Sequence, residues 1–192
     1  GGGGSIASTT RYYLSPDATF GEGDVLLDGS REVPELPAGA SSAGSTSLTI
    51  PVGNAAGTFY VFAKADAGNL IAETQEANNE TGRAIRIGPD LVVSSVTMSP
   101  SSVAAGAVVT VTDTVVNQGA GAAGPSVTRH YLSVNTLFDG ADLLLTPGRS
   151  VSDIAAGASS AGSTPVTIPD GTLPGKYYVL AKADGEGGVA ES

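Results

Sequence analysis

The chain has 192 residues, which is enough for one large domain or for two domains of β-sandwich size. Its 27 glycines and 11 prolines suit short strands joined by turns, and no long segment shows the 3.6-residue apolar period of an amphipathic helix. Acidic residues outnumber basic residues by 19 to 9, and the net charge of −10 repels nucleic acids and anionic membrane surfaces. We therefore expect no nucleic-acid partner.

The sequence holds no cysteine, so disulfide bonds contribute nothing to its stability. No segment approaches the roughly 20 consecutive apolar residues that span a bilayer, and we expect no membrane insertion within these residues. The first residues lack the pattern of a signal peptide, so any leader or anchor is expected outside this sequence.

Several short segments have the composition of β-strands, because Val, Thr, Tyr and Ile are frequent in them and Gly, Pro and Asn separate them. In chain order the expected strands are residues 83–87, 91–98, 108–117, 127–133, 142–145, 149–154, 163–168 and 176–184. The clearest pattern lies in residues 108–117, where Val109, Val111 and Val115 share one face and threonines occupy the other. Strands of this number and length predict an all-β fold with antiparallel sandwiches.

The chain repeats itself at an interval of 118 residues. Residues 11–15 (RYYLS) return as residues 129–133 (RHYLS), and residues 38–46 return unchanged as residues 156–164. Such self-similarity is the signature of a repeated structural unit.

The repeat predicts two tandem immunoglobulin-like β-sandwich domains, residues 1–88 and residues 89–192. Pro89 is expected to mark the junction, because proline removes a backbone donor and restricts the residue before it. The first repeat is expected to lack its first two strands, and the second its last strand. Open sandwiches of this kind favour pairing with neighbouring repeats of the same protein, including a homopolymer formed by strand complementation.

An ordered set of motifs along the chain resembles the CARDB family, the cell-adhesion-related domain found in bacteria. The motifs are residues 72–79 (AETQEANN), 89–93 (PDLVV), 115–119 (VVNQG), 131–133 (YLS), 142–144 (DLL), 156–160 (AGASS) and 175–178 (GKYY). The resemblance implies an immunoglobulin-like sandwich, often in tandem, in exported prokaryotic proteins. It implies neither a particular ligand nor a reaction.

Two acidic loops are the candidate metal sites. The first loop follows the Tyr-Leu-Ser motif in each repeat, and its candidate ligands are Asp17, Glu22, Asp24, Asn135, Asp139 and Asp142. The candidates of the second loop are Asp66, Asn69, Glu73 and Glu76. Ca²⁺ takes six to eight oxygen ligands, which these side chains and loop carbonyls could supply. The competing interpretation, which we favour, is that the Asp and Asn side chains bind backbone amides within turns.

Two further residues carry chemistry. Asp113 lies on the same face of its strand as the valines, so its carboxylate is expected to face an edge or to bind a Lys or Arg. An isopeptide bond between Lys182 and Asn117 is a further alternative. His130 is the single histidine and replaces Tyr12 of the first repeat, so we expect a packing residue and no catalytic base.

These observations favour a non-enzymatic, extracellular role. We expect a structural and adhesive repeat module of a bacterial surface or secreted protein, acting as a stalk or a filament-forming unit. The alternative is an accessory module of a secreted enzyme that binds a polysaccharide or a host protein, with Tyr12, Tyr60 and Tyr178 as its aromatic contributors.

Overall fold

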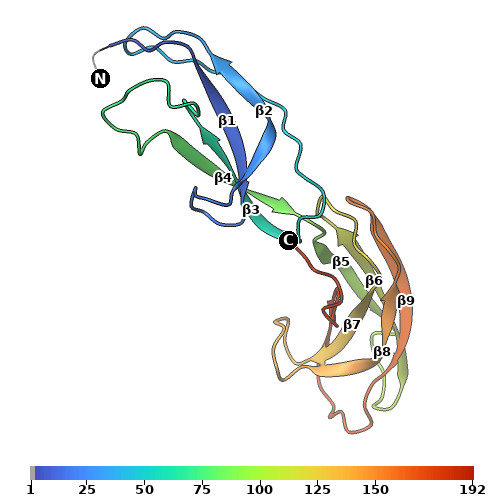
Figure 1. Ribbon diagram of the computed structural model, residues 1–192. Coiled ribbons are helices and arrows are strands. Elements are labelled where there is room, and N and C mark those ends of the chain that lie inside the picture. Colours follow the sequence, from blue (N-terminus) through green and yellow to red (C-terminus); the bar gives the residue numbers. More distant parts are fainter. Residues whose placement is uncertain (1–2) are drawn as a thin grey trace. The chain divides into compact units, whose positions relative to one another are not determined.

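The computed structural model describes residues 3–192 as ten β-strands without a helix (Figure 1). The chain divides into two compact units. The first consists of the residues up to Asn54 together with Thr58–Arg86, and the second of Ala55–Gly57 and Ile87–Ser192. The all-β class expected from the sequence is confirmed.

The first unit is built on one four-stranded sheet. Its strands are β1 (Ser8–Ser15), β2 (Val25–Val33), β3 (Gly57–Lys64) and β4 (Glu80–Ile87), in the order β2-β1-β3-β4. β1 is antiparallel to both β2 and β3 and lies between them.

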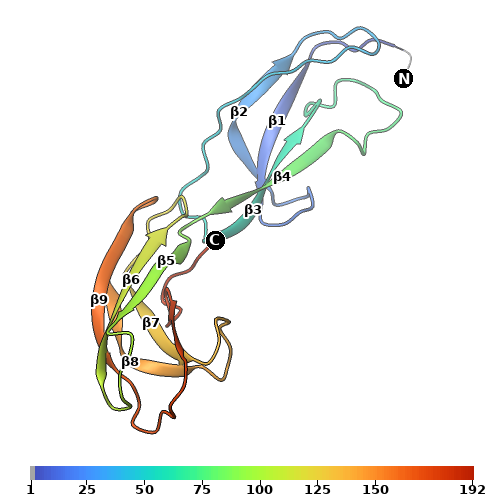
Figure 2. The same cartoon turned by 180° about the vertical axis from the view of Figure 1, so that it is seen from behind.

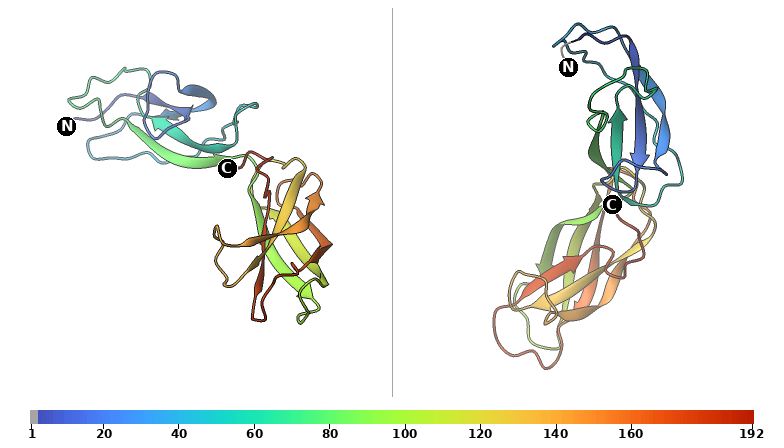
Figure 3. Two further views of the ribbon diagram at one scale, coloured as in Figure 1. Left: turned by 90° about the horizontal axis from the view of Figure 1, so that it is seen from below. Right: turned by 60° about the vertical axis from the view of Figure 1, so that its left-hand side comes forward.

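The second unit has two three-stranded sheets, which form the two layers of a sandwich (Figures 2 and 3). One sheet has the order β5-β6-β9 and the other the order β10-β7-β8. Its strands are β5 (Leu91–Ser99), β6 (Val108–Asn117), β7 (Ser126–Ser133), β8 (Leu143–Val151), β9 (Ser159–Thr167) and β10 (Tyr178–Lys182). All pairs within these sheets are antiparallel, as the period-two pattern of β6 predicts.

The structure corrects one strand prediction. Residues 142–145 and 149–154 were expected as two strands because Pro147 and Gly148 lie between them. They belong largely to one strand, β8, whose register against β7 shifts between Thr128 and His130. β8 lies at an edge of its sheet, where a proline without an N–H group is tolerated.

The strands of the two units correspond, except in the layer that the sheet β5-β6-β9 forms in the second unit. β1 and β2 align with β7 and β8 at the 118-residue interval, but residues 41–49, which align with β9, do not form a strand. They run as coil beside β2 (Figure 1). The physical reason is that β9 pairs with β6 along its whole length, and the described part of the first unit has no counterpart of β6.

The apolar core is concentrated in the second unit. One cluster is formed around Val109, Val111 and Leu145, and a second around Val115 and Val151. Among the described residues, the first unit contributes three buried apolar side chains, which are Leu14, Leu27 and Phe62. The smaller core follows from the missing layer, because a sheet buries its inner face only against another element.

Candidate functional sites

The first acidic loop is a turn held by its own side chains. In the first unit Asp17 accepts a bond from the Thr19 amide (2.7 Å), and Asp24 accepts one from the Gly21 amide (3.0 Å). In the second unit, the corresponding side chain of Asn135 accepts a bond from the Leu137 amide. Asp142 likewise accepts one from the Asp139 amide. The bonds recur at the 118-residue interval, which indicates a conserved turn geometry.

The remaining candidates of this loop differ in their contacts. Asp139 accepts a further bond from the Ala141 amide at 2.8 Å, while Glu22 is exposed on the loop surface. Oxygen atoms that already accept bonds from backbone amides have fewer lone pairs left for a cation.

In the second acidic loop, backbone amides again bind side-chain oxygens, here those of an aspartate in a strained backbone conformation. Asp66 has a positive φ of 41°, and its two carboxylate oxygens accept bonds from the amides of Leu70 and Ile71 at 3.1 and 2.8 Å. Asp184, at the same place in the second unit, also has a φ of 41° and binds the amides of Gly188 and Val189 at 3.0 and 2.8 Å. The carboxylate holds the loop that follows the strand closed in both units.

The other candidates lie around this aspartate. Asn69 has a φ of 50°, and its backbone N–H donates a hydrogen bond to the carbonyl of Asp66. Glu76 accepts bonds from the Glu73 amide and from the side chain of Asn79. Within residues 3–192 no three His, Cys, Asp or Glu side chains converge as they would around a metal ion.

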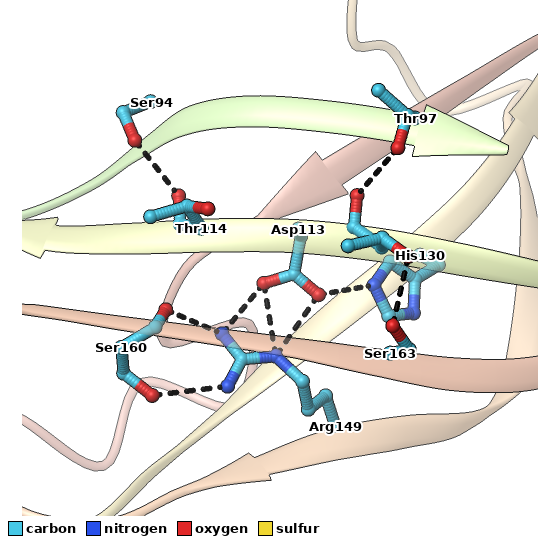
Figure 4. A network of polar contacts seen from close by, with 9 residues as sticks. Ser94, Thr97, Asp113, Thr114, His130, Arg149, Ser160 and Ser163 are labelled. Carbon is cyan, nitrogen blue, oxygen red and sulfur yellow. Dashed lines mark hydrogen bonds and ion pairs between the residues drawn. The ribbon is translucent and has the colours of Figure 1, made fainter.

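A buried polar layer lies at the centre of the second unit (Figure 4). Asp113 on β6 is fully buried, and the guanidinium of Arg149 on β8 binds both of its oxygens. The Nε atom of Arg149 lies 3.0 Å from each oxygen, and Nη2 lies 2.6 Å from Oδ1. Of the alternatives left open by the sequence, the structure selects a buried carboxylate paired with arginine.

His130 on β7 completes this layer. Its Nε2 atom lies 3.1 Å from Oδ2 of Asp113, and the ring is fully buried. An ionised carboxylate only accepts hydrogen bonds, so a hydrogen bond to ionised Asp113 is donated by Nε2. The Nδ1 atom of His130 and the hydroxyls of Ser126 and Thr128 are buried without a hydrogen-bond partner among the described atoms.

The polar layer separates the two apolar clusters. Along β6, Val111 belongs to one cluster and Val115 to the other, with Asp113 between them. On β8, Leu145 and Val151 belong to different clusters as well, and Arg149 lies between them. A buried ion pair of this kind disfavours other registers of the facing strands, because a register that separates the partners leaves a buried charge unpaired.

Sequence reasoning identified Asp113 but missed the residues that bind it. The signal was available, since Arg149 and Arg31 align at the repeat interval on an inward-facing strand position. The isopeptide alternative finds no support in the contacts. Asn117 binds the carbonyls of Gly121 and Ile154, and the Lys182 ammonium lies over the Phe138 ring at 5.5 Å.

Both units contain turns in which Asp or Asn side chains bind backbone amides. Comparison with known families agrees with the repeat. The family model CARDB matches residues 1–83 and residues 88–192. The chain belongs to the CARDB family. No curated protein matches it. No helix of residues 3–192 has the length and hydropathy needed to cross a membrane.

The second CARDB repeat also contains an open pocket of about 420 Å³ beside its core, lined by apolar and polar residues. It opens next to the Val111 cluster, and its lining includes Met98, Leu132, Ile168, Leu173 and Tyr177. Of the aromatic residues expected to bind a ligand, Tyr12 instead hydrogen-bonds Thr46 within the first repeat. The Tyr178 ring is partly covered by the Lys176 ammonium at 5.0 Å.

Proposed function

We propose that this chain is a non-catalytic, extracellular repeat module of a bacterial surface or secreted protein, and that its repeats act as structural and adhesive spacers. The observation that carries the proposal is the tandem occurrence of two CARDB units in one chain whose residues 3–192 form strands and no helix. The spacing role follows from the repeat, since stacked units add length without requiring a shared active site.

The buried layer supports a non-catalytic role. An Asp–His pair resembles part of a catalytic triad, but catalysis requires the base to reach a substrate. Asp113 and His130 are both fully buried, and Arg149 occupies the carboxylate. These three residues instead bind one another across the two sheets of the sandwich.

The adhesive and filament-forming part of the proposal is supported by the open strands. In the described sheets β2 and β8, which align at the repeat interval, are both edge strands. Exposed edges of this kind pair with other strands, so neighbouring repeats of the same protein are the proposed partners.

Two measurements test the proposal. Surface labelling of producing cells with an antibody against residues 1–192 should give a signal without permeabilisation. Signal only after permeabilisation would reject the extracellular role. Electron microscopy of the purified protein tests the filament: dispersed particles at high concentration would exclude polymer formation by this chain alone.

A ligand-binding accessory module is the second candidate, and the open pocket of the second repeat is the observation in its favour. Apolar pockets of a few hundred Å³ are typical small-molecule sites. A glycan array and a fluorescent apolar probe test this candidate. Binding that the substitution Leu173→Asp abolishes would support it, and absence of binding to both would remove it.

A further inference from the structure

Two cations face each other across the same pair of strands in both units. Arg11 on β1 lies directly opposite Lys64 on β3, and at the 118-residue interval Arg129 on β7 lies directly opposite Lys182 on β10. Like charges in directly opposite positions of a ladder destabilise a sheet. The cation pair is nevertheless present in both units of a chain whose net charge is −10. An anion bound by both cations removes this cost.

These cations lie on the outer face of their sheet, which points away from the other layer of the sandwich. In the second unit Thr128 and His130 are buried against that layer, so the alternation along β7 places Arg129 on the outer side. In the first unit Thr10 is buried and Arg11 is exposed, in the same alternation. The accessibility of this face therefore does not depend on whether a second layer covers the inner face.

Aromatic side chains adjoin each cation pair. In the first unit the next outward position of β1 is Tyr13, about 7 Å further along the strand, and its ring meets that of Phe20 edge to face at 5.0 Å. The Lys64 ammonium lies 5.1 Å from the centre of the Phe20 ring. The second unit repeats both contacts, with Tyr131 and Phe138 in the equivalent places. A cation pair and aromatic rings thus share one surface in each unit.

The two units differ in what neutralises the cation pair. In the second unit Arg129 forms an ion pair with Glu186, which follows β10. The residue at the same place in the first unit is Gly68. Among residues 3–192 no carboxylate forms an ion pair with Arg11 or Lys64. Only the second unit therefore supplies this position with a carboxylate of its own.

We propose that the outer face of the first unit binds an acidic polysaccharide, with Arg11 and Lys64 receiving the carboxylate of a uronic acid and Tyr13 contacting its ring. A guanidinium and a carboxylate match as a bidentate pair, and the C–H face of a sugar packs on an aromatic ring. A uronic acid carries its carboxylate directly on its ring, which suits the spacing of about 7 Å between the cation pair and Tyr13. Tyr60, opposite Ser15, extends the same face along β3.

The sheet favours a ligand that is recognised by side chains alone. β1 is paired with β2 on one side and with β3 on the other, so it offers no free backbone edge to an added peptide strand. The inference rests on the ligand-binding module proposed above as the second candidate. It names the ligand class and a site apart from the open pocket of the second repeat.

The test titrates the whole chain with a trimer of galacturonic acid and with the methyl ester of that trimer, which has the same rings without the charges. The expected result for the acid is saturable binding that shifts the Arg11 Nε–H resonance and the ring resonances of Tyr13. The ester should bind about tenfold more weakly or worse, because the charge-assisted hydrogen bonds are lost.

Substitutions separate the cation pair from the rest of the surface. Arg11→Gln and Lys64→Gln should each weaken binding of the acid about tenfold and bring its affinity close to that of the ester. Arg83→Gln is the matched control, because Arg83 is an exposed arginine on β4, and it should leave the affinity unchanged. Glu186→Gly frees Arg129 from its ion pair and should add a second binding event for the acid.

Contrary results distinguish the failure of this inference from the failure of the proposed function. Equal binding of the acid and the ester, or full binding by Arg11→Gln, would overturn the inference. Binding that Leu173→Asp abolishes and Arg11→Gln leaves intact would also overturn it and assign the ligand to the open pocket. A hexaglutamate peptide that binds as tightly as the trimer would replace the sugar by an acidic protein segment. Cell-surface labelling does not depend on any of these results.

Discussion

Substitution of Asp113 by alanine removes the carboxylate that neutralises the buried layer of the second repeat. The side chain of Arg149 is only 9% exposed, and it would lose all three of its contacts with Asp113 and keep those with Ser160. His130 would lose its hydrogen bond as well. Removal of one partner from a buried ion pair costs about 3–5 kcal/mol, against about 5–15 kcal/mol for the total stability of a typical domain.

Hydrogen exchange measures this loss within the second unit alone. A cost of about 3 kcal/mol corresponds to more than a hundredfold faster exchange through global opening, since about 1.4 kcal/mol is a factor of ten. The amides of Val111 and Val115 on β6 are the reporters, and urea unfolding followed by circular dichroism gives the independent free energy. Asp153→Ala is the matched control, because Asp153 is exposed and its loss should change stability by no more than about 0.5 kcal/mol.

A second variant separates the buried charge from packing. In Asp113→Val with Arg149→Met, no charge of the pair remains, and buried ion pairs replaced by apolar residues often lose little stability. We expect this double variant to recover at least half of the loss caused by Asp113→Ala. The reasoning is refuted if Asp113→Ala costs less than about 1 kcal/mol, or if the double variant costs the sum of the two single substitutions.

Two further predictions concern the loops, and one concerns Asp28 on β2. Asp184→Ala should cost about 1–2 kcal/mol and speed hydrogen exchange at Gly188 and Val189, because both amides lose their acceptor, and unchanged exchange there would contradict the capping role. The Thr49 amide bond lowers the pKa of Asp28 below 3.8, so the ionised form is favoured in the folded state. Its stabilising effect is therefore present at neutral pH and lost as the pH falls through the lowered pKa, and an NMR titration of the Thr49 amide should show a midpoint below 3.8. Millimolar Ca²⁺ followed by EGTA should leave the melting midpoint unchanged if the acidic loops are capped turns, whereas a rise reversed by EGTA would establish a calcium site.

Much of the fold could be predicted because its signals are local. The alternating valines and threonines of residues 108–117 match β6 at both ends, and the 118-residue interval predicts that β1 and β2 correspond to β7 and β8. The error at β8 arose because Pro147 reads as a strand break unless the strand is known to lie at an edge. Edge position depends on the order of strands in the sheet, which no local pattern contains.

The candidate sites also differ in whether their contacts are local or distant along the chain. The capping role of Asp24 and Asp142 depends on an amide three residues away, so the choice of Asp in a turn was sufficient to predict it. The partners of Asp113 lie 17 and 36 residues away, on strands of the opposite sheet. The alternation of side chains along β6 indicated that the charge of Asp113 is buried. Its partners could not be identified without knowing which strands of the two sheets face each other.

This contrast between local and distant contacts also explains what the two repeats share. Several bonds that span only a few residues within a loop recur in both units, including the two amide bonds to Asp66 and to Asp184. The ladder of residues 41–49 and the carboxylate of Arg31 are absent from the described first unit, and both depend on a second layer. Arg31, Ser42 and Gly44 nevertheless keep the pose of Arg149, Ser160 and Gly162, so the orientation of this arginine depends on its contacts with the segment around the serine and not on the carboxylate.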